Sequence, residues 1–229
     1  MDDPVPPPAS PLASDLDLAT VDRLLSTTRS VRRRLDPTRP VPAGVIRECL
    51  ELAVQAPSPA DVQSWRWVVV TDEATRKTIA DMYRAANEPY VRSELDRLPP
   101  GDSSERRRFA SVIDLIEHLH EIPVLVVAYV VEPDLPGLGD QAMPPALLYG
   151  GAFPAVWSFQ LALRARGLGT TPLFVADEAP LADIVGAPAN AHLVGLLPVA
   201  YYTGTTFKPA ARRPLDEVAF GDTWGAPLG

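Results

Sequence analysis

A cluster of arginines with one hydroxyl stands early in the chain, at Thr28-Arg29-Ser30-Val31-Arg32-Arg33-Arg34. Guanidinium groups form paired hydrogen bonds to phosphate oxygens, and a nearby hydroxyl can add another. Each charge-assisted hydrogen bond contributes about 1.5–3 kcal/mol. The cluster therefore predicts a site for one small phosphate-bearing ligand. The alternative is a set of solvated arginines at a helix end, where cations are favoured in any case.

A loop rich in proline follows the next predicted helix, as Ala56-Pro57-Ser58-Pro59-Ala60-Asp61-Val62-Gln63-Ser64-Trp65. It comes directly before the apolar, strand-like residues 66–70. The order of these segments indicates a pocket for a cofactor that carries phosphate: first the basic cluster, then a helix, and then a Pro-Ser loop at the edge of a strand.

The other reactive side chains form no recognisable catalytic or metal-binding set. His118 and His120 are two residues apart near a helix end, so their side chains point away from each other. Together with His192 they match no metal-binding spacing and no Ser-His-Asp arrangement. Cys49 lies on the apolar stripe of a predicted helix, where a small core residue is expected.

Composition limits the possible partners. The chain has 229 residues, of which 46% are hydrophobic and 22% charged, and its formal net charge is −8. Such an acidic protein repels nucleic acid and anionic lipid. We see no signal peptide and no apolar run long enough to cross a bilayer, and the single cysteine excludes an intrachain disulfide. We therefore expect a cytoplasmic protein without nucleic-acid or membrane partners.

The predicted elements alternate between helices and strands, which indicates an α+β or α/β layer fold. Residues 1–16 are rich in proline and are expected to form an extended arm, and residues 17–229 a single domain. We expect helices near residues 17–28, 42–55, 72–86, 104–120, 147–166 and 178–185, and strands near residues 66–71, 124–131 and 192–202.

Three stretches suggest how these elements pack. Residues 66–71 are bulky and alternate poorly, as in a strand buried on both faces. Residues 147–166 are apolar nearly all round, which predicts a helix buried in a core or a subunit interface, ended by Gly167. The segments 87–104 and 132–146 are expected to be irregular walls of the pocket.

In their order and spacing, these segments resemble the FMN-dependent nitroreductase family. The resemblance extends from about residue 20 to the C-terminus, including the helix that runs into Gly-Leu-Gly-Thr, the tail motif Arg212-Arg213-Pro214-Leu215 and the ending Asp222-Thr223-Trp224-Gly225. Within the family's Ala-Pro-Ser loop and the strand after it, the matching residues are Ala56, Pro57, Ser58, Gln63, Trp65 and Trp67.

The resemblance implies an α+β fold of three layers, with a central, mainly antiparallel sheet flanked by helices, and a homodimer with FMN at the subunit interface beside a long helix. It also implies an oxidoreductase in which NADH or NADPH delivers hydride to FMN and a nitroaromatic or quinone-like acceptor then takes it, in ping-pong fashion. The cofactor would carry the redox chemistry, which explains the absence of a visible acid–base pair.

By position, the resemblance implies three groups of FMN-binding residues. The basic cluster and the tail would hold the phosphate end, and the Pro-Ser loop would approach from the other subunit. A segment after Gly169 would lie along the ring, with a backbone N–H near its N5 atom. The residues are Arg29, Ser30, Arg32, Arg33, Arg212 and Arg213 for the first group, Pro57, Ser58, Asp61 and Gln63 for the second, and Pro172, Leu173, Phe174 and Val175 for the third.

The chain departs from the family pattern at Thr28, Asp61 and Ser64, where the family often has a basic residue, Asn and Pro. An ionised Asp61 only accepts hydrogen bonds, and its charge would oppose the negative charge of a reduced flavin. We expect it to lower the flavin's reduction potential or weaken its binding, unless it turns to solvent or caps a local turn.

Two other functions remain open. The protein could use FMN for another reaction of the superfamily, such as dehydrogenation, dehalogenation or oxidation of the flavin itself. Alternatively, it could have lost the cofactor and act by sequestration or interaction.

Overall fold

The computed structural model describes residues 16–101, 103–132 and 144–229. Most of the predicted Pro-rich arm and of the loop predicted at 132–146 lies outside them. The chain divides into two compact units, one formed by Ser30–Thr205 and the other by the residues up to Arg29 together with Thr206–Gly229. The predicted boundary at residue 17 between an arm and a single domain stays a prediction.

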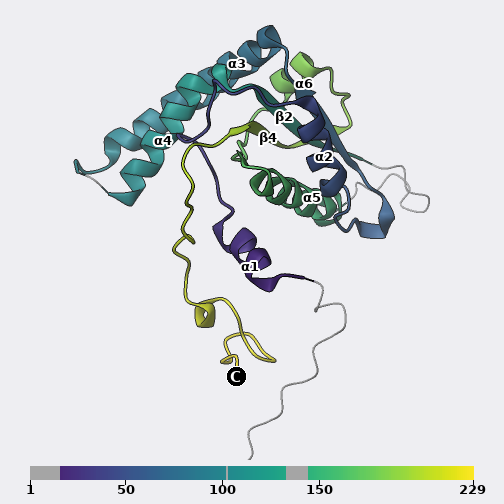
Figure 1. Ribbon diagram of the computed structural model, residues 1–229, viewed down its shortest axis with the longest axis vertical. Coiled ribbons are helices and arrows are strands. Elements are labelled where there is room, and N and C mark those ends of the chain that lie inside the picture. Colours follow the sequence, from purple (N-terminus) through teal and green to yellow (C-terminus); the bar gives the residue numbers. More distant parts are fainter. Residues whose placement is uncertain (1–15, 102, 133–143) are drawn as a thin grey trace, which may run out of the picture. The chain divides into compact units, whose positions relative to one another are not determined.

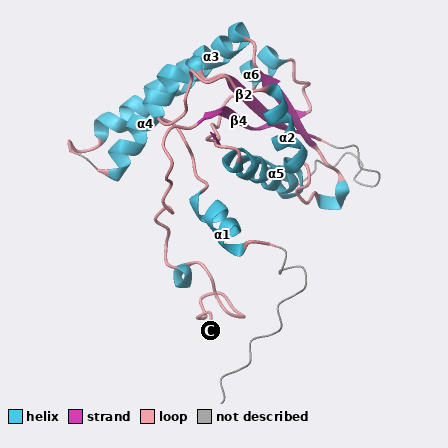
Figure 2. Ribbon diagram, viewed as in Figure 1, coloured by secondary structure: helices cyan, strands magenta, loops and turns pink. Residues whose placement is uncertain are grey.

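An antiparallel sheet forms the centre of the unit Ser30–Thr205 (Figures 1 and 2). In its described part, the strand order is β1-β2-β4-β3, and every neighbouring pair is antiparallel. The predicted mainly antiparallel sheet is therefore confirmed. The strands are β1 (Trp65–Val70), β2 (Val124–Val131), β3 (Leu168–Gly169) and β4 (Ala191–Tyr201).

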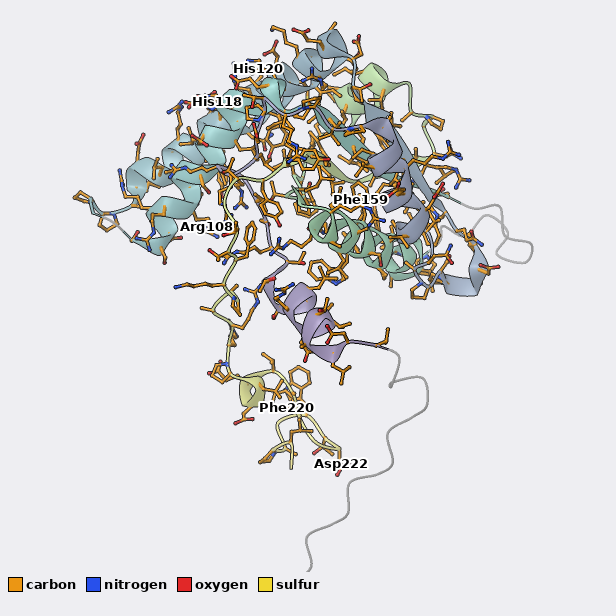
Figure 3. All side chains as sticks on the ribbon, in the orientation of Figure 1. Arg108, His118, His120, Phe159, Phe220 and Asp222 are labelled. Carbon is orange, nitrogen blue, oxygen red and sulfur yellow. The ribbon has the colours of Figure 1, made fainter. Side chains whose placement is uncertain are left out.

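Helices α2 (Ala43–Ala53) and α5 (Pro145–Ala165) pack on one face of this sheet. Side chains alternate across a strand, so the even-numbered residues of β2 from Val124 to Val130 all point to this face. Phe159 of α5 is fully buried among them, with its ring 5.6 Å from that of Trp67 (Figure 3). The core thereby fixes α5, whose C-terminal end leads through Gly167 into β3.

The opposite face is also covered by helices. Leu125 and Val127 of β2 point to this face and are fully buried. Figure 1 shows α3 (Glu73–Arg97) and α6 (Ala179–Val185) on this side, and α4 (Ser104–His118) packs against α3. Helices therefore flank the sheet on both sides, and the predicted three-layer α+β fold is confirmed.

Helix α3 is longer than the sequence indicated. Asp72 caps it as predicted, because its carboxylate accepts a hydrogen bond from the backbone N of Thr75 at 2.8 Å. The helix then continues through Pro89 to Arg97. The prediction that residues 87–104 form an irregular pocket wall is therefore wrong for residues 87–97.

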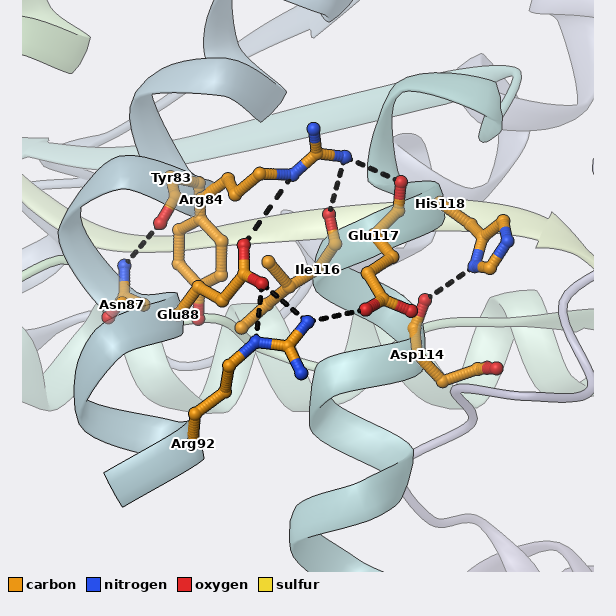
Figure 4. A network of polar contacts seen from close by, with 9 residues as sticks. All are labelled: Tyr83, Arg84, Asn87, Glu88, Arg92, Asp114, Ile116, Glu117 and His118. Carbon is orange, nitrogen blue, oxygen red and sulfur yellow. Dashed lines mark hydrogen bonds and ion pairs between the residues drawn. The ribbon is translucent and has the colours of Figure 1, made fainter. Parts of the chain in front are cut away.

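Contacts with α4 explain why Pro89 does not end α3. Arg92 pairs with Glu88 of the same helix and with Glu117 of α4, both at 2.6 Å (Figure 4). Val91, two residues beyond the proline, is buried. Ion pairing and burial together offset the one helical hydrogen bond that a proline cannot donate.

Arginines of α3 also bind the far end of α4. Arg76 Nη1 donates to the carbonyl oxygens of His120 and Ile122, at 2.8 and 2.7 Å. Arg84 Nη2 donates to the carbonyl oxygen of Glu117 at 2.6 Å (Figure 4). Carbonyls at and just beyond a helix C-terminus lack intrahelical partners, so these guanidinium groups satisfy them and hold the two helices together.

Strand β1 is not buried on both faces, which corrects the sequence prediction. Trp65 and Val70 are buried at its two ends, but Arg66 and Val69 are exposed. In the described part of the sheet, β1 is an edge strand that pairs only with β2. An edge position leaves part of one face uncovered, which is why bulky residues here are not all in the core.

Helix α5 is long and apolar enough to cross a membrane by length and composition alone, and 44% of that span is buried within the protein. This corrects the expectation that no apolar run of such length exists. The core helix of a globular fold passes the same test, because a helix packed against a sheet is also apolar on most sides.

The second unit contains α1 (Leu18–Thr27) and the C-terminal segment. The predicted first helix is confirmed, with Asp17 at its N-cap position. The tail is irregular, as expected, apart from a short 3-10 turn at Leu215–Glu217. Near its end, the ring of Phe220 lies 5.2 Å from that of Trp224, and Trp224 is 93% exposed (Figure 3).

Candidate functional site

The basic segment runs alongside the residues that follow β3. The backbone N of Val31 donates to the carbonyl oxygen of Thr170 at 2.9 Å. Gly169 makes this approach possible, because a Cβ placed there would lie only 2.9–3.1 Å from three side-chain atoms of Val31. This contact brings the predicted site residues Ser30–Arg33 close to the start of the segment that contains Pro172–Val175.

Arg32 is a half-buried cation with an unusual environment. Its Nε is buried and has no hydrogen-bond partner among the described residues. Burial lowers the pKa of the guanidinium, the nearby phenol of Tyr83 opposes this shift, and the cation of Arg108 adds to it. A buried donor without a partner is costly, and a bound anion would offset that cost at this Nε.

The next two arginines have partners within the same unit. Arg33 Nε lies 3.9 Å from Asp114 Oδ2 of α4, and both side chains are about half exposed. Arg34 Nε donates to the carbonyl oxygen of Thr203 at 2.6 Å. Arg34 therefore helps to hold the segment, while a role of Arg33 in ligand binding stays a prediction.

The segment Thr170–Val175 is anchored to the sheet at Leu173. The backbone N and O of Leu173 exchange hydrogen bonds with Leu196 of β4, at 2.8 and 2.9 Å, and its side chain is buried. Phe174, one residue further, is 65% exposed. This alternation directs one side of the segment to the core and the other outward.

Sequence reasoning missed two residues of this segment, Thr170 and Thr171. Both side chains are buried, and neither hydroxyl has a hydrogen-bond partner in the described parts of the chain. A buried hydroxyl without a partner costs about 1–3 kcal/mol. The available signal was the pair of polar residues that follows an apolar helix and Gly-Leu-Gly.

The Pro57–Gln63 loop is held by its own polar side chains. Ser58 Oγ accepts from the backbone N of Gln63, and Gln63 Nε2 donates to Asp61 Oδ1, both at 2.8 Å. Ala60, Asp61 and Gln63 have left-handed backbone, with φ of 50°, 55° and 50°. Backbone strain of this kind collects at functional loops.

This loop packs against α5, the helix predicted to be buried in a core or a subunit interface. A Cβ added to Gly151 of α5 would lie 3.0 Å from Pro59 Cδ and 3.4 Å from the Cα of Ser58. Pro57, Asp61 and Gln63 are exposed. The predicted approach of these residues to a ligand held by a second subunit stays a prediction.

The remaining predicted residues belong to the other unit. Arg29 Nη1 donates to the carbonyl oxygen of Lys208 at 3.1 Å, which links α1 to the tail within that unit. Arg212 Nη1 donates a hydrogen bond to the carbonyl oxygen of its neighbour Ala211 at 3.1 Å, and Arg213 is exposed. Their role in phosphate binding stays a prediction.

The histidine and cysteine side chains noted in the sequence have ordinary structural surroundings at two positions, His118 and Cys49. No group of histidine, cysteine and acidic residues in the described parts of the chain could hold a metal ion. His118 Nδ1 forms a hydrogen bond with the carbonyl oxygen of Asp114 at 2.8 Å, at the end of α4 (Figure 4). Burial raises the pKa of the Cys49 thiol to about 11, so this cysteine is an unreactive core residue, as predicted.

These features define an α+β protein in which Arg32, Thr170 and Thr171 have buried polar atoms without partners in the described residues. The sequence model of the Nitroreductase family matches residues 25–201. The chain belongs to this family, whose members are oxidoreductases.

Individual relatives differ in their reactions. An NADH dehydrogenase of Thermus thermophilus is 29% identical over 206 residues, which is 83% of this chain and 90% of that protein. A 5,6-dimethylbenzimidazole synthase of Rhodospirillum rubrum is 29% identical over 201 residues, 86% of each chain. A crystal structure of iodotyrosine deiodinase bound to FMN and 3-iodo-L-tyrosine shares the fold, with a TM-score of 0.62 and 21% identity, over 86% of this chain and 95% of that one.

Proposed function

We propose that this protein is an FMN-dependent oxidoreductase that accepts electrons from NADH or NADPH and passes them to a nitroaromatic or quinone-like acceptor. The observation that carries the proposal is the unpartnered Nε of Arg32, on a segment paired with Thr170. A phosphate would supply the missing negative charge, and the hydroxyls of Thr170 and Thr171 could bond to other polar atoms of the ligand. The donor set therefore fits FMN.

Bound FMN would supply hydride chemistry that the side chains of this site lack. The chain would contribute binding, orientation and exclusion of water. Ser30 and Arg32 would hold the phosphate end. The segment from Pro172 to Val175, fixed to β4 through Leu173, would face the ring with its main-chain N–H groups, which can stabilise negative charge without a side-chain acid.

Nucleotide reduction tests this reaction. Protein reconstituted with FMN should lose its flavin absorbance on addition of NADH or NADPH, and a nitroaromatic should restore it. If neither nucleotide reduces the flavin, the second candidate is favoured, namely another FMN reaction of the superfamily. Support for that candidate comes from the relatives named as a dimethylbenzimidazole synthase and an iodotyrosine deiodinase.

Replacing Asp61 by asparagine should raise the midpoint potential of bound FMN by about 20 mV, because one carboxylate charge near the ring is removed. Asparagine also tolerates the left-handed backbone at this position, where φ is 55°. Spectroelectrochemical titration measures the shift. Asp96→Asn is the control: it removes an exposed carboxylate of α3 and should leave the flavin's midpoint potential unchanged. An unshifted potential in Asp61→Asn would show that Asp61 does not act on the flavin.

We also propose a homodimer that pairs through α5. Tyr149, Phe153 and Trp157 are spaced by four residues along one side of this helix, and Phe153 and Trp157 are 50% and 39% exposed.

Phe153→Asp should weaken the dimer at least about 100-fold, since burying an aromatic side chain contributes about 1.5–3 kcal/mol per subunit. Light scattering across a dilution series measures this. Tyr90→Asp, which changes a more exposed aromatic residue of α3, should leave the dimer affinity unchanged, and a monomeric wild-type protein would contradict the proposal.

A further inference from the structure

The loop between α2 and β1 is held in a strained backbone conformation. Ala60, Asp61 and Gln63 all have φ between 50° and 55°, a left-handed conformation that side chains other than glycine rarely adopt. Such a conformation persists only where surrounding contacts hold it. The contacts that hold this loop therefore identify the residues that depend on its shape.

Ser58 makes the contact that reaches furthest along the loop. Two backbone hydrogen bonds close its first turn, from Asp61 N to the carbonyl oxygen of Ser58 and from Val62 N to that of Pro59, both at 3.1 Å. Neither of these bonds reaches Gln63. The backbone N of Gln63 donates instead to Ser58 Oγ at 2.8 Å, so a side chain fixes the N-terminal side of this residue.

Gln63 in turn holds the carboxylate of Asp61. Its Nε2 donates to Asp61 Oδ1 at 2.8 Å. Its carbonyl oxygen accepts from Arg66 Nη1 at 3.1 Å, which ties the other side of Gln63 to β1. Contacts thus run from the Ser58 hydroxyl through Gln63 to Asp61, and Ser58 acts on the carboxylate without touching it.

Helix α5 packs against the loop at Ser58 and Pro59. A Cβ at Gly151 would lie 3.0 Å from Pro59 Cδ, 3.4 Å from Ser58 Cα and 3.6 Å from Ser58 Oγ, so the loop would have to shift. A Cβ at the neighbouring Gly150 would lie 3.7 Å from Pro59 Cγ, which is an ordinary contact. The close approach of α5 to the loop therefore requires glycine at position 151 but not at position 150.

The polar atoms that the loop leaves unused are mainly acceptors. No described residue donates a hydrogen bond to Asp61 Oδ2 or to Gln63 Oε1, and both side chains are exposed. An ionised carboxylate can only accept hydrogen bonds. The loop thus presents oxygen atoms in a fixed position, which suits a ligand that carries an N–H donor, such as the imide or amide of a ring.

We propose that Ser58 and Gly151 are positioning residues that fix the carboxylate of Asp61 toward an N–H group of the bound ring. That this ring is a flavin rests on the proposed function, whereas the hold of Ser58 on Gln63 does not. Ser58 then acts through Gln63 and not through its own contact with the cofactor.

Amide hydrogen exchange of the full chain without added FMN tests the hold of Ser58. In Ser58→Ala, the amide of Gln63 should exchange at least about tenfold faster than in the wild type, because it loses its hydrogen-bond acceptor. Ser93→Ala, at an exposed position of α3, is the control and should leave the exchange of Gln63 unchanged. Unchanged protection of Gln63 in Ser58→Ala would overturn the proposal.

The midpoint potential of bound FMN tests whether Ser58 acts through Asp61. Asp61→Asn should shift this potential less than about half as much in Ser58→Ala protein as in the wild type, because the carboxylate there has no fixed position. In Ser93→Ala protein the full shift should remain. A purely structural role of Ser58 would leave the shift equal in all three backgrounds, and that result would refute its action on Asp61.

The two neighbouring glycines of α5 provide a matched test of the contact with the loop. Gly151→Ala should lower the affinity for FMN at least about tenfold because the loop must move, whereas Gly150→Ala should change it less than about twofold. Both substitutions favour the helix to the same extent, so the difference reports the contact with the loop. Equal affinities in the two variants would refute the role of Gly151.

These outcomes separate the inference from the proposed function. If no FMN binds but Gln63 exchanges faster in Ser58→Ala, the proposed function fails and the hold of Ser58 on the loop stands. If FMN binds and its potential does not respond to Asp61→Asn, the carboxylate does not face the ring and this inference fails alone.

Discussion

Replacement of Arg32 by methionine should lower the affinity for FMN at least about 100-fold, because it removes charge-assisted hydrogen bonds worth about 1.5–3 kcal/mol each. In the absence of FMN, the same variant should be as stable as the wild type or more stable. The reason is that Arg32 is half-buried, has a buried Nε without a partner in the described residues, and lies near the Arg108 cation. Calorimetric titration gives the affinity, and thermal unfolding gives the stability.

The opposite signs of these two effects make the test specific. A residue that only supports the fold would lose stability and affinity together. Arg47→Met is the matched control, because Arg47 is an exposed arginine of α2 paired with Glu51 at 3.2 Å, and it should change neither quantity by much. If folded Arg32→Met protein binds FMN as tightly as the wild type, Arg32 does not hold the phosphate.

Replacement of Gly169 by alanine should destabilise the protein by about 1–3 kcal/mol, the usual cost of overpacking a tight contact. The added Cβ would lie 2.9–3.1 Å from Cβ and both Cγ atoms of Val31, so the segment bearing Ser30 and Arg32 must move away from Thr170. FMN affinity should fall as well, because Arg32 moves with that segment. Chemical denaturation and flavin titration measure the two effects.

A double variant tests the cause of this effect. Val31→Gly removes the Cβ and both Cγ atoms that the new methyl group would meet, so Gly169→Ala with Val31→Gly should regain at least half of the lost affinity, a non-additive result. Gly44→Ala is the control, because a Cβ at this position of α2 meets no atom within 4 Å and should stabilise the helix by up to about 1 kcal/mol. Strictly additive losses would show that Val31 is not the clashing neighbour.

The elements with continuous apolar runs could be read from the sequence. β2 (Val124–Val131) is buried along almost its whole length, so its sequence is apolar throughout, and no other local structure competes with a strand there. Helix α5 was equally recognisable, because Gly167, with φ of 75°, ends it as a C-cap glycine does.

Elements that depend on distant partners could not be read in the same way. Pro89 is a strong local signal against a helix, but burial of Val91 and the packing of α3 on α4 together offset it. Residues 66–71 look like a central strand, yet β1 lies at the described edge of the sheet. Both errors arose because tertiary contacts overrode local preference.

The candidate site, too, could be predicted from the sequence only in part. Arg32 was identified from residue type and spacing, but its missing partner and its position beside Thr170 follow from a contact between residues far apart in the sequence. Thr170 and Thr171 gave no signal as single residues, since threonine is common in loops and strands. Only their burial without hydrogen-bond partners in the described residues makes them candidate ligand donors.

Titration of the purified protein with FMN, followed by flavin absorbance and fluorescence, tests the central claim most directly. We predict a yellow protein that saturates at one FMN per chain, with binding weakened in Arg32→Met and retained in Arg47→Met. A folded, colourless protein that takes up no added FMN would contradict the account and favour a protein that acts by sequestration or interaction.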